Sequence, residues 1–241
     1  MLGQPRHGEV TAVFELACIL SPEGADPLSL VLPEIGDGPL NVVVPGVPGS
    51  FARLVPGTGC DFSTQRLRLG GLAVDLSAAH VWEPRPTWDR LRAHLPQVAG
   101  RLQVLQAMAL ASAPEGSLLS LLAGKPVAGG GLAGSTWLSA KQAALALRTG
   151  WLGDGAGLAT AAARLAGLGQ GLTPAGDDFL AGVMLWAWLA HPAPQAFCQA
   201  VLAVAAPRTT ALSAAFLRAA ARGECSAAWH ALLEGLAAPG G

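Results

Sequence analysis

Charged side chains are scarce in this chain. They make up 13% of its 241 residues, against about a quarter in a typical soluble domain, while hydrophobic residues make up 51%. The formal net charge of −1 argues against non-specific nucleic-acid binding, which needs a basic surface. Because so little charge is left to cover the surface, we expect an apolar face to be buried in a homo-oligomer or in a hetero-complex.

Long apolar runs and paired cysteines are also missing. The longest apolar run, Phe179 to Ala190, is well short of the roughly 20 residues that a membrane span needs. Polar residues near the start interrupt any signal-peptide pattern. The scattered cysteines include no C-x-x-C pair, which favours reduced thiols over disulfides or zinc ligands. We therefore expect a cytoplasmic protein that binds no membrane. The cysteines are Cys18, Cys60, Cys198 and Cys225.

Several familiar catalytic strings do not occur. The five histidines show no H-E-x-x-H spacing, and there is no G-x-S-x-G elbow. Residues 129–134 do satisfy G-x-G-x-x-G as a string. However, Lys125-Pro126 precedes it where a dinucleotide site requires a strand. We therefore reject nucleotide binding there, and a glycine loop near the active site is the alternative.

The chain changes character near residue 84. Before that point, short runs of Val, Ile, Leu and Phe alternate with Pro and Gly clusters, which is typical of strands. Gly70-Gly71 is a two-residue hairpin signal, and no helix-length segment separates the strands. We predict an antiparallel β domain over residues 1–84. Strands are expected within 9–20, 28–32, 40–44, 65–69 and 72–76.

Residues 85–241 show a helical pattern instead. Apolar positions recur at helical spacing, for example at Val98, Leu102 and Leu105. The predicted fold class is α+β, with the antiparallel β domain packed on a mainly helical C-terminal domain that has one buried central helix. Helices are expected over 88–95, 96–111, 117–122, 136–148, 158–166, 174–190, 195–205, 210–222 and 226–236.

Residues 167–182, which read GLGQGLTPAGDDFLAG, carry the strongest chemical signal. Thr173-Pro174 predicts an N-cap followed by proline at the first helical position. The helix beyond is apolar on every side, so it is predicted to be buried. Gly176 in its first turn indicates a close approach, because glycine there costs about 1 kcal/mol relative to alanine.

This helix start suits two kinds of ligand. Free N–H groups beside a glycine run favour a small anion. Asp177 and Asp178 could hold a cation or accept protons, and the structural alternative is that first-turn acids simply suit the helix dipole. A second candidate anion site is Arg208-Thr209-Thr210, with Ser213 one turn later. The alternative for that segment is an ordinary capped helix start.

Residues 167–182, together with Thr209-Thr210-Ala-Leu-Ser213, resemble the signature of a bacterial family long labelled as a domain of unknown function. The family includes one subunit of the oxamate carbamoyltransferase of allantoin breakdown, a step of purine catabolism. Ala175 stands where that family usually has a serine. The resemblance implies a subunit of such a complex, which exchanges oxalurate and phosphate with oxamate and carbamoyl phosphate. Other carbamoyltransferase subunits would be its partners.

The resemblance directs the choice of site residues. Asp177 and Asp178 are the expected catalytic residues, and they would orient an amide nitrogen or hold Mg²⁺ against the phosphate. No other cofactor is expected. Two alternatives stay open, namely a non-catalytic assembly subunit and a stand-alone metal-dependent hydrolase that uses the same aspartates. The residues expected to bind the small anionic substrate and phosphate are Gly169, Gly171, Thr173, Gly176, Arg208, Thr209 and Thr210.

Overall fold

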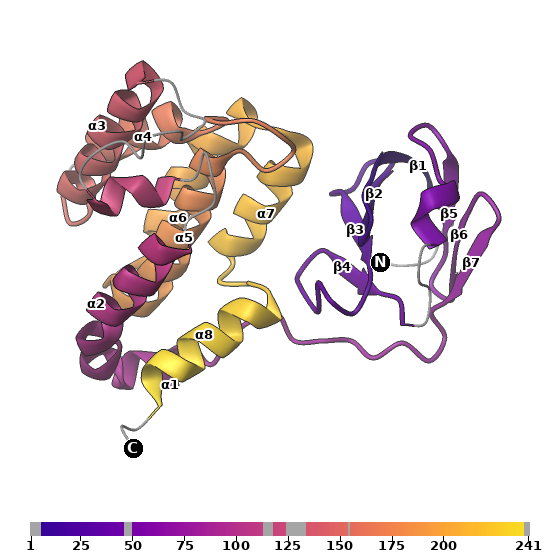
Figure 1. Cartoon of the computed structure of the whole chain (residues 1–241), viewed down its shortest axis with the longest axis horizontal. Helices are drawn as coiled ribbons and strands as arrows, with labels where there is room; N and C mark the ends of the chain where they lie inside the picture. Colours follow the sequence, from indigo (N-terminus) through magenta and orange to yellow (C-terminus); the bar gives the residue numbers. More distant parts are fainter. Residues whose placement is uncertain (1–5, 46–49, 113–117, 124–133, 154, 239–241) are drawn as a thin grey trace. The chain divides into compact units, whose positions relative to one another are not determined.

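The computed structural model describes residues 6–45, 50–112, 118–123, 134–153 and 155–238 (Figure 1). The chain divides into two compact units, Met1–Pro84 with Ser226–Ala228, and Arg85–Cys225 with Trp229–Gly241. The first unit contains a sheet and the second is helical, so the predicted α+β class is confirmed. Most of the glycine string at 129–134 lies outside the described residues.

One sheet forms the β unit, with the strand order β4-β3-β2-β1-β5-β6-β7 among the described residues. The predicted hairpin at Gly70-Gly71 is confirmed, because Leu69 of β6 pairs with Leu72 of β7. The strands are β1 (Arg6–Val13), β2 (Ala17–Pro22), β3 (Leu28–Val31), β4 (Asn41–Val43), β5 (Gly59–Phe62), β6 (Arg66–Leu69) and β7 (Leu72–Asp75).

Three features of the sheet differ from the prediction. The run expected over 9–20 holds parts of two antiparallel strands, β1 and β2. Strands β3 and β4 pair in parallel, whereas the other described pairs are antiparallel. The nine-residue connection over 32–40 replaces the tight turn of an antiparallel hairpin and carries the chain back to the same end. Strand β5 was not predicted, since its four residues include a glycine and an aspartate, which are typical of turns.

The β unit has its own apolar core. Leu67 and Leu69 of β6 are each 1% exposed, and they pack with buried side chains of the other strands. Arg66 and Arg68 alternate with them and are exposed. This period of two places charge on one face of the sheet and hydrophobic side chains on the other. The short 3-10 helix η1 (Ser50–Arg53) supplies the fully buried Phe51.

The helical unit contains most of the predicted helices at close to their predicted bounds. Two further 3-10 turns, η2 (Leu118–Ala123) and η3 (Ala206–Arg208), connect longer helices. The α-helices are α1 (Trp88–Ala93), α2 (Leu95–Ala111), α3 (Gly134–Gly150), α4 (Gly155–Leu165), α5 (Ala175–Ala190), α6 (Pro194–Ala205), α7 (Ala211–Ala221) and α8 (Ala227–Ala237).

Helix α5 lies at the centre of this unit, packed against α1, α4, α6 and α7 (Figure 1). All of its residues except Asp178 are buried or half-buried, so the predicted central helix is confirmed. Leu180, Met184 and Leu189 are its most deeply buried large side chains. The first turn of α5 therefore brings polar groups to the edge of the main apolar core. Among the described residues, no helix is long and apolar enough to span a membrane.

Candidate functional site

Helix α5 begins one residue later than the sequence suggests. Its first residue is Ala175, and its N-cap is Pro174, with ψ of 142° and no side-chain cap. The predicted cap at Thr173 was therefore wrong, and Thr173 is exposed. The extended Pro174 turns its carbonyl toward the helix, where it accepts hydrogen bonds from the N–H groups of Asp177 (2.9 Å) and Asp178 (3.2 Å). These are the ordinary first hydrogen bonds of the helix, and no side-chain hydroxyl caps it.

Three N–H groups of this first turn have protein partners. Gly176 N–H donates to the Leu168 carbonyl at 2.8 Å, while the next two N–H groups donate to Pro174. Unpaired N–H groups are what make a helix start attract anions. An anion at this terminus would therefore meet fewer free donors than a bare helix end offers.

Asp177 joins three segments of the chain. Its side chain is 2% exposed; Oδ1 accepts the Gly167 N–H at 3.0 Å, and Oδ2 accepts the Thr209 hydroxyl. A buried carboxylate is tolerated only when its oxygens are hydrogen-bonded. We call Gly167, Asp177 and Thr209 the Asp177 latch. The latch fixes the glycine loop and the start of α7 against the start of α5.

The glycines of the latch region allow close backbone contacts. Gly167 has φ of 70°, and a Cβ atom there would lie 2.6 Å from the Arg208 carbonyl oxygen. At Gly176 a Cβ atom would lie 2.0 Å from the Leu165 carbonyl oxygen. The close approach predicted at Gly176 is thus made by the Leu165 carbonyl at the end of α4. This carbonyl fills the space beside the glycine.

Thr210 and Arg208 also contact the backbone. The Thr210 hydroxyl donates to the Leu172 carbonyl at 2.5 Å and accepts the Ser213 N–H at 3.0 Å, which makes Thr210 the N-cap of α7. Arg208 is exposed, and its Nη1 donates to the Val204 carbonyl at 2.6 Å. Thr210 therefore ties the glycine loop to α7.

Asp178 has different surroundings from Asp177. Its side chain is exposed at the edge of a largely apolar pocket of about 750 Å³. The pKa of Asp178 is raised to about 6, first because neighbouring atoms displace water from the carboxylate and second because Asp177 repels its charge. The described residues that line the pocket are Leu118, Leu119, Leu121, Ala144, Leu147, Arg148, Trp151, Ala175, Asp178, Phe179, Gly182, Val183, Trp186 and Trp229.

The two aspartates do not form a ready metal site. Both Asp177 oxygens already accept hydrogen bonds from the protein. Across the described ranges, no group of three or more His, Cys, Asp or Glu side chains is placed to hold a metal ion. Mg²⁺ usually relies on one or two carboxylates together with substrate phosphates and water. The geometry adds no support for the Mg²⁺ ion that the resemblance implies.

The structure gathers some of the expected site residues and separates others. Asp177, Gly176 and Thr209 meet at the latch, and Thr210 contacts the same loop. Gly169 and Gly171 lie in the exposed loop with φ of 123° and 87°. The pocket beside Asp178 was not predicted from the sequence. Its residues come from four separate segments, and helical patterning alone does not show that such segments meet.

The comparison with known families adds to this geometry. Residues 165–240 match the family model described as "Oxamate carbamoyltransferase subunit AllH". This part of the chain is similar to that subunit. The matched residues make up about a third of the chain and include the whole Asp177 latch and Asp178. The resemblance seen in the glycine-rich signature is thereby confirmed. No curated protein and no solved structure matches the chain.

Proposed function

We propose that this chain is a subunit of an oxamate carbamoyltransferase-like complex and that Asp178 acts on its substrate. One observation carries the proposal. Within the segment similar to the transferase subunit, a hydrogen-bonded Asp177 adjoins an exposed Asp178 with a pKa of about 6. Perturbed carboxyl groups beside a pocket are typical of functional sites. In this proposal Asp177 positions the loop, and Asp178 is the catalytic residue.

The proposed reaction consumes oxalurate and phosphate. A phosphate oxygen bonds to the carbamoyl carbon, and the bond from that carbon to the oxamate nitrogen breaks. The leaving nitrogen takes up the proton that hydrogen phosphate loses, so oxamate and carbamoyl phosphate are formed with atoms and charge in balance. A carboxyl group with a pKa of about 6 is suited to accept that proton and deliver it to nitrogen near neutral pH.

Binding of the two anions is assigned to the surroundings of the latch. Gly169, Gly171 and Thr173 belong to an exposed loop, so their backbone groups are accessible to a ligand. Arg208 is the last residue of η3 and is exposed beside the latch residue Thr209. Arginine pairs well with both carboxylate and phosphate because its donors form a planar fork. These groups are proposed to hold oxalurate and phosphate.

A second candidate function is a non-catalytic assembly subunit. The observation that favours it is the apolar lining of the pocket beside Asp178, which includes Phe179, Trp151 and Trp186. Such a lining suits side chains of another protein better than it suits a small polar substrate. In this alternative the latch stabilises the fold, and the catalytic residues belong to a partner subunit.

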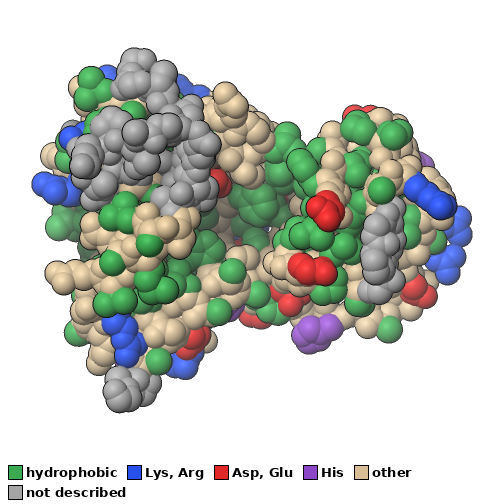
Figure 2. Space-filling view, in the orientation of Figure 1, with side chains coloured by type: hydrophobic (Ala, Val, Ile, Leu, Met, Phe, Trp, Pro, Cys, Tyr) green, Lys and Arg blue, Asp and Glu red, His purple; other side chains and the backbone are tan. Residues whose placement is uncertain are grey.

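Both candidates require partners. Exposed apolar side chains occur on neighbouring turns of α2, at Val104 (62% exposed) and Met108 (64%), and on α3, at Leu138 (51%) and Leu145 (50%). Figure 2 shows apolar side chains over much of the visible surface, with few charged ones among them. We propose a hetero-complex, or a homo-oligomer when partners are absent. Light scattering is expected to give a mass above the 24.3 kDa of one chain.

An activity assay on the assembled complex separates the candidates. The chain is purified alone and with co-expressed partner subunits, and carbamoyl phosphate formation from oxalurate and phosphate is measured. Activity of the complex that is lost in Asp178→Asn, with assembly intact, supports the catalytic role. Full activity in Asp178→Asn supports the assembly role. No carbamoyl phosphate from any preparation, together with a soluble monomer that takes up no partner, would contradict both.

A further inference from the structure

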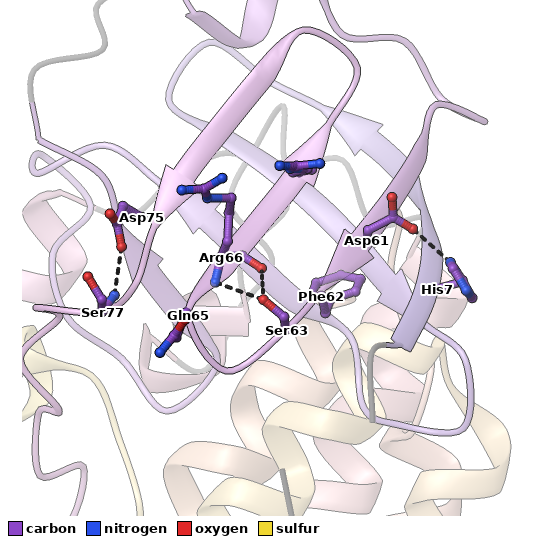
Figure 3. A pocket seen from close by; sticks show the side chains of 9 residues that line it. His7, Asp61, Phe62, Ser63, Gln65, Arg66, Asp75 and Ser77 are labelled. Carbon is purple, nitrogen blue, oxygen red and sulfur yellow. Dashed lines mark hydrogen bonds and ion pairs between the residues drawn. The ribbon is translucent and has the colours of Figure 1, made fainter. Parts of the chain in front are cut away.

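A polar basin lies on the charged face of strands β5, β6 and β7, away from the latch region in sequence (Figure 3). Its volume is about 620 Å³. Basic side chains also gather at the edge of the β unit near β6 and β7 in the space-filling view (Figure 2). The residues that line the basin are His7, Asp61, Phe62, Ser63, Gln65, Arg66, Arg68, Asp75 and Ser77.

Two arginines of β6 line the basin. Arg66 and Arg68 occupy alternate positions of β6, so both side chains leave the same face of the sheet while Leu67 and Leu69 enter the core. Alternate residues of a strand are about 6.7 Å apart along the backbone. The basin therefore presents two guanidinium groups that leave the same face of one strand, from backbone positions about 6.7 Å apart.

The two carboxylates of the basin already have other partners. Asp61 pairs in register with Arg68, but its Oδ1 is hydrogen-bonded to His7 Nδ1 at 2.7 Å. Asp75 pairs in register with Arg66 and accepts the Ser77 N–H at 2.9 Å. Hydrogen bonds from Ser77 lower the pKa of Asp75, with a smaller contribution from the Arg66 charge. Figure 3 shows these two carboxylates near opposite ends of the basin.

The guanidinium groups are the second pair of charged groups in the basin, and each stands across the sheet from one of the two carboxylates. Within the part of the chain that the structure describes, neither Arg66 nor Arg68 makes a side-chain hydrogen bond or an ion pair with another residue. Arginine offers a planar fork of donors that fits the paired oxygens of carboxylate and phosphate groups. The Gln65 side chain at the rim adds an uncharged amide.

We propose that this basin binds a small dianion whose two carboxylate or phosphate groups are several ångströms apart. One anionic group pairs with Arg66 and the other with Arg68, and neither has to displace Asp61 from His7 or Asp75 from Ser77. This site is separate from the proposed transferase chemistry, since it uses other residues in the other unit. A ligand with one anionic group pairs with only one of the two arginines and binds more weakly.

Isothermal titration of the full chain tests the proposal with three probes: succinate, pyrophosphate and acetate at matched ionic strength. Succinate or pyrophosphate is expected to bind, and acetate to bind at least about tenfold more weakly. Arg66→Ala combined with Arg68→Ala is expected to lower affinity for the dianion by at least about tenfold. The corresponding double lysine variant keeps the charge without the fork and is expected to show an intermediate loss.

Two control variants locate the binding. Arg53→Ala removes an exposed arginine elsewhere in the β unit, and Arg164→Ala removes an exposed arginine of α4. Both are expected to bind the dianion as the wild type does. The proposal is overturned if neither dianion binds, if acetate binds equally well, or if the double alanine variant keeps full affinity. Loss of binding in either control variant would likewise overturn it, because the ligand would then lie elsewhere.

Discussion

The two units of this protein place their charged side chains in opposite ways. In the β unit, Arg66 and Arg68 stand on an open face, where water solvates them at little cost. In the helical unit, Asp177 lies 2% exposed at the edge of the core, where both oxygens need hydrogen-bond donors. A charged side chain on the open face does not hold other segments of the backbone in place. The buried Asp177 holds the glycine loop, the start of α5 and the start of α7 together.

The same contrast occurs within two adjacent residues of α5. Successive side chains of an α-helix point about 100° apart, so Asp177 faces inward and Asp178 faces outward. Both oxygens of the Asp177 carboxylate accept hydrogen bonds from the protein, whereas the Asp178 carboxylate is accessible beside a pocket. Adjacent identical residues thus have different surroundings because of the helix geometry. Substitutions in each unit test this contrast between buried and exposed charged side chains.

The largest effect is expected at Gly176. In Gly176→Ala the new Cβ atom would meet the Leu165 carbonyl oxygen at 2.0 Å, so the backbone around the latch has to move. A loss of about 3 kcal/mol or more in unfolding free energy is expected, measured by urea denaturation. Gly235→Ala is the matched control, because nothing lies within 4 Å of its Cβ atom in α8. It is expected to stabilise by up to about 1 kcal/mol; equal effects at both glycines would contradict this packing.

The next largest effect is expected for Asp177→Ala. It leaves the Gly167 N–H and the Thr209 hydroxyl without their acceptor in a buried setting. Each unsatisfied group costs about 1–3 kcal/mol, so a total loss of about 3 kcal/mol is expected. Thr209→Val removes one of the two bonds and is expected to cost about half as much. A change below about 0.5 kcal/mol for Asp177→Ala, measured by urea denaturation, would show that the latch does not stabilise the fold.

A smaller effect, dependent on pH, is expected for Asp178→Asn. The pKa of Asp178 is about 6 in the folded protein and about 3.9 in an unfolded chain, so between these values the folded state binds more protons. Wild-type stability therefore falls as pH rises from about 4 to 7 through this group. Asparagine removes that loss, so the variant gains relative to the wild type with rising pH. Parallel denaturation curves at pH 4.5 and 7 check this; a constant difference would argue against the raised pKa.

The smallest effect is expected on the open face of the β unit. Asp61→Ala removes the exposed pair with His7, and exposed ion pairs contribute about 0–1 kcal/mol. We expect a loss below about 0.5 kcal/mol, measured in the same denaturation assay. A loss as large as that of Asp177→Ala would break the comparison between the units, since it would make the open face as constrained as the latch.

The sequence predicted the parts of the fold that depend on local patterns. Helix α5 was predicted because its residues are apolar on every side, and the β6–β7 hairpin because Gly70-Gly71 suits a two-residue turn. Strand β5 was missed because four residues with turn-like composition carry little periodicity. The cap at Thr173 was predicted wrongly, because Pro174 is the N-cap and the Leu168 carbonyl accepts the Gly176 N–H that a cap hydroxyl would take.

The candidate site was predictable in its residue types but not in its contacts. The glycine-rich signature marked Asp177 and Asp178 as unusual for an apolar helix. Their division into an inward and an outward carboxylate depends on where the helix begins and on Thr209, which is 32 residues away in the chain. The Leu168 carbonyl that takes up the Gly176 N–H follows from the path of the loop. Long-range contacts of this kind leave no periodic signal.

We propose that Asp177 positions the loop while Asp178 acts on the substrate. Carbamoyl phosphate formation from oxalurate and phosphate is measured with the assembled complex that carries Asp178→Asn. A loss of at least about 100-fold is expected, with assembly retained and a melting temperature at pH 7 no lower than that of the wild type. Full turnover, together with a melting temperature several degrees lower, would contradict it and make Asp178 a structural residue.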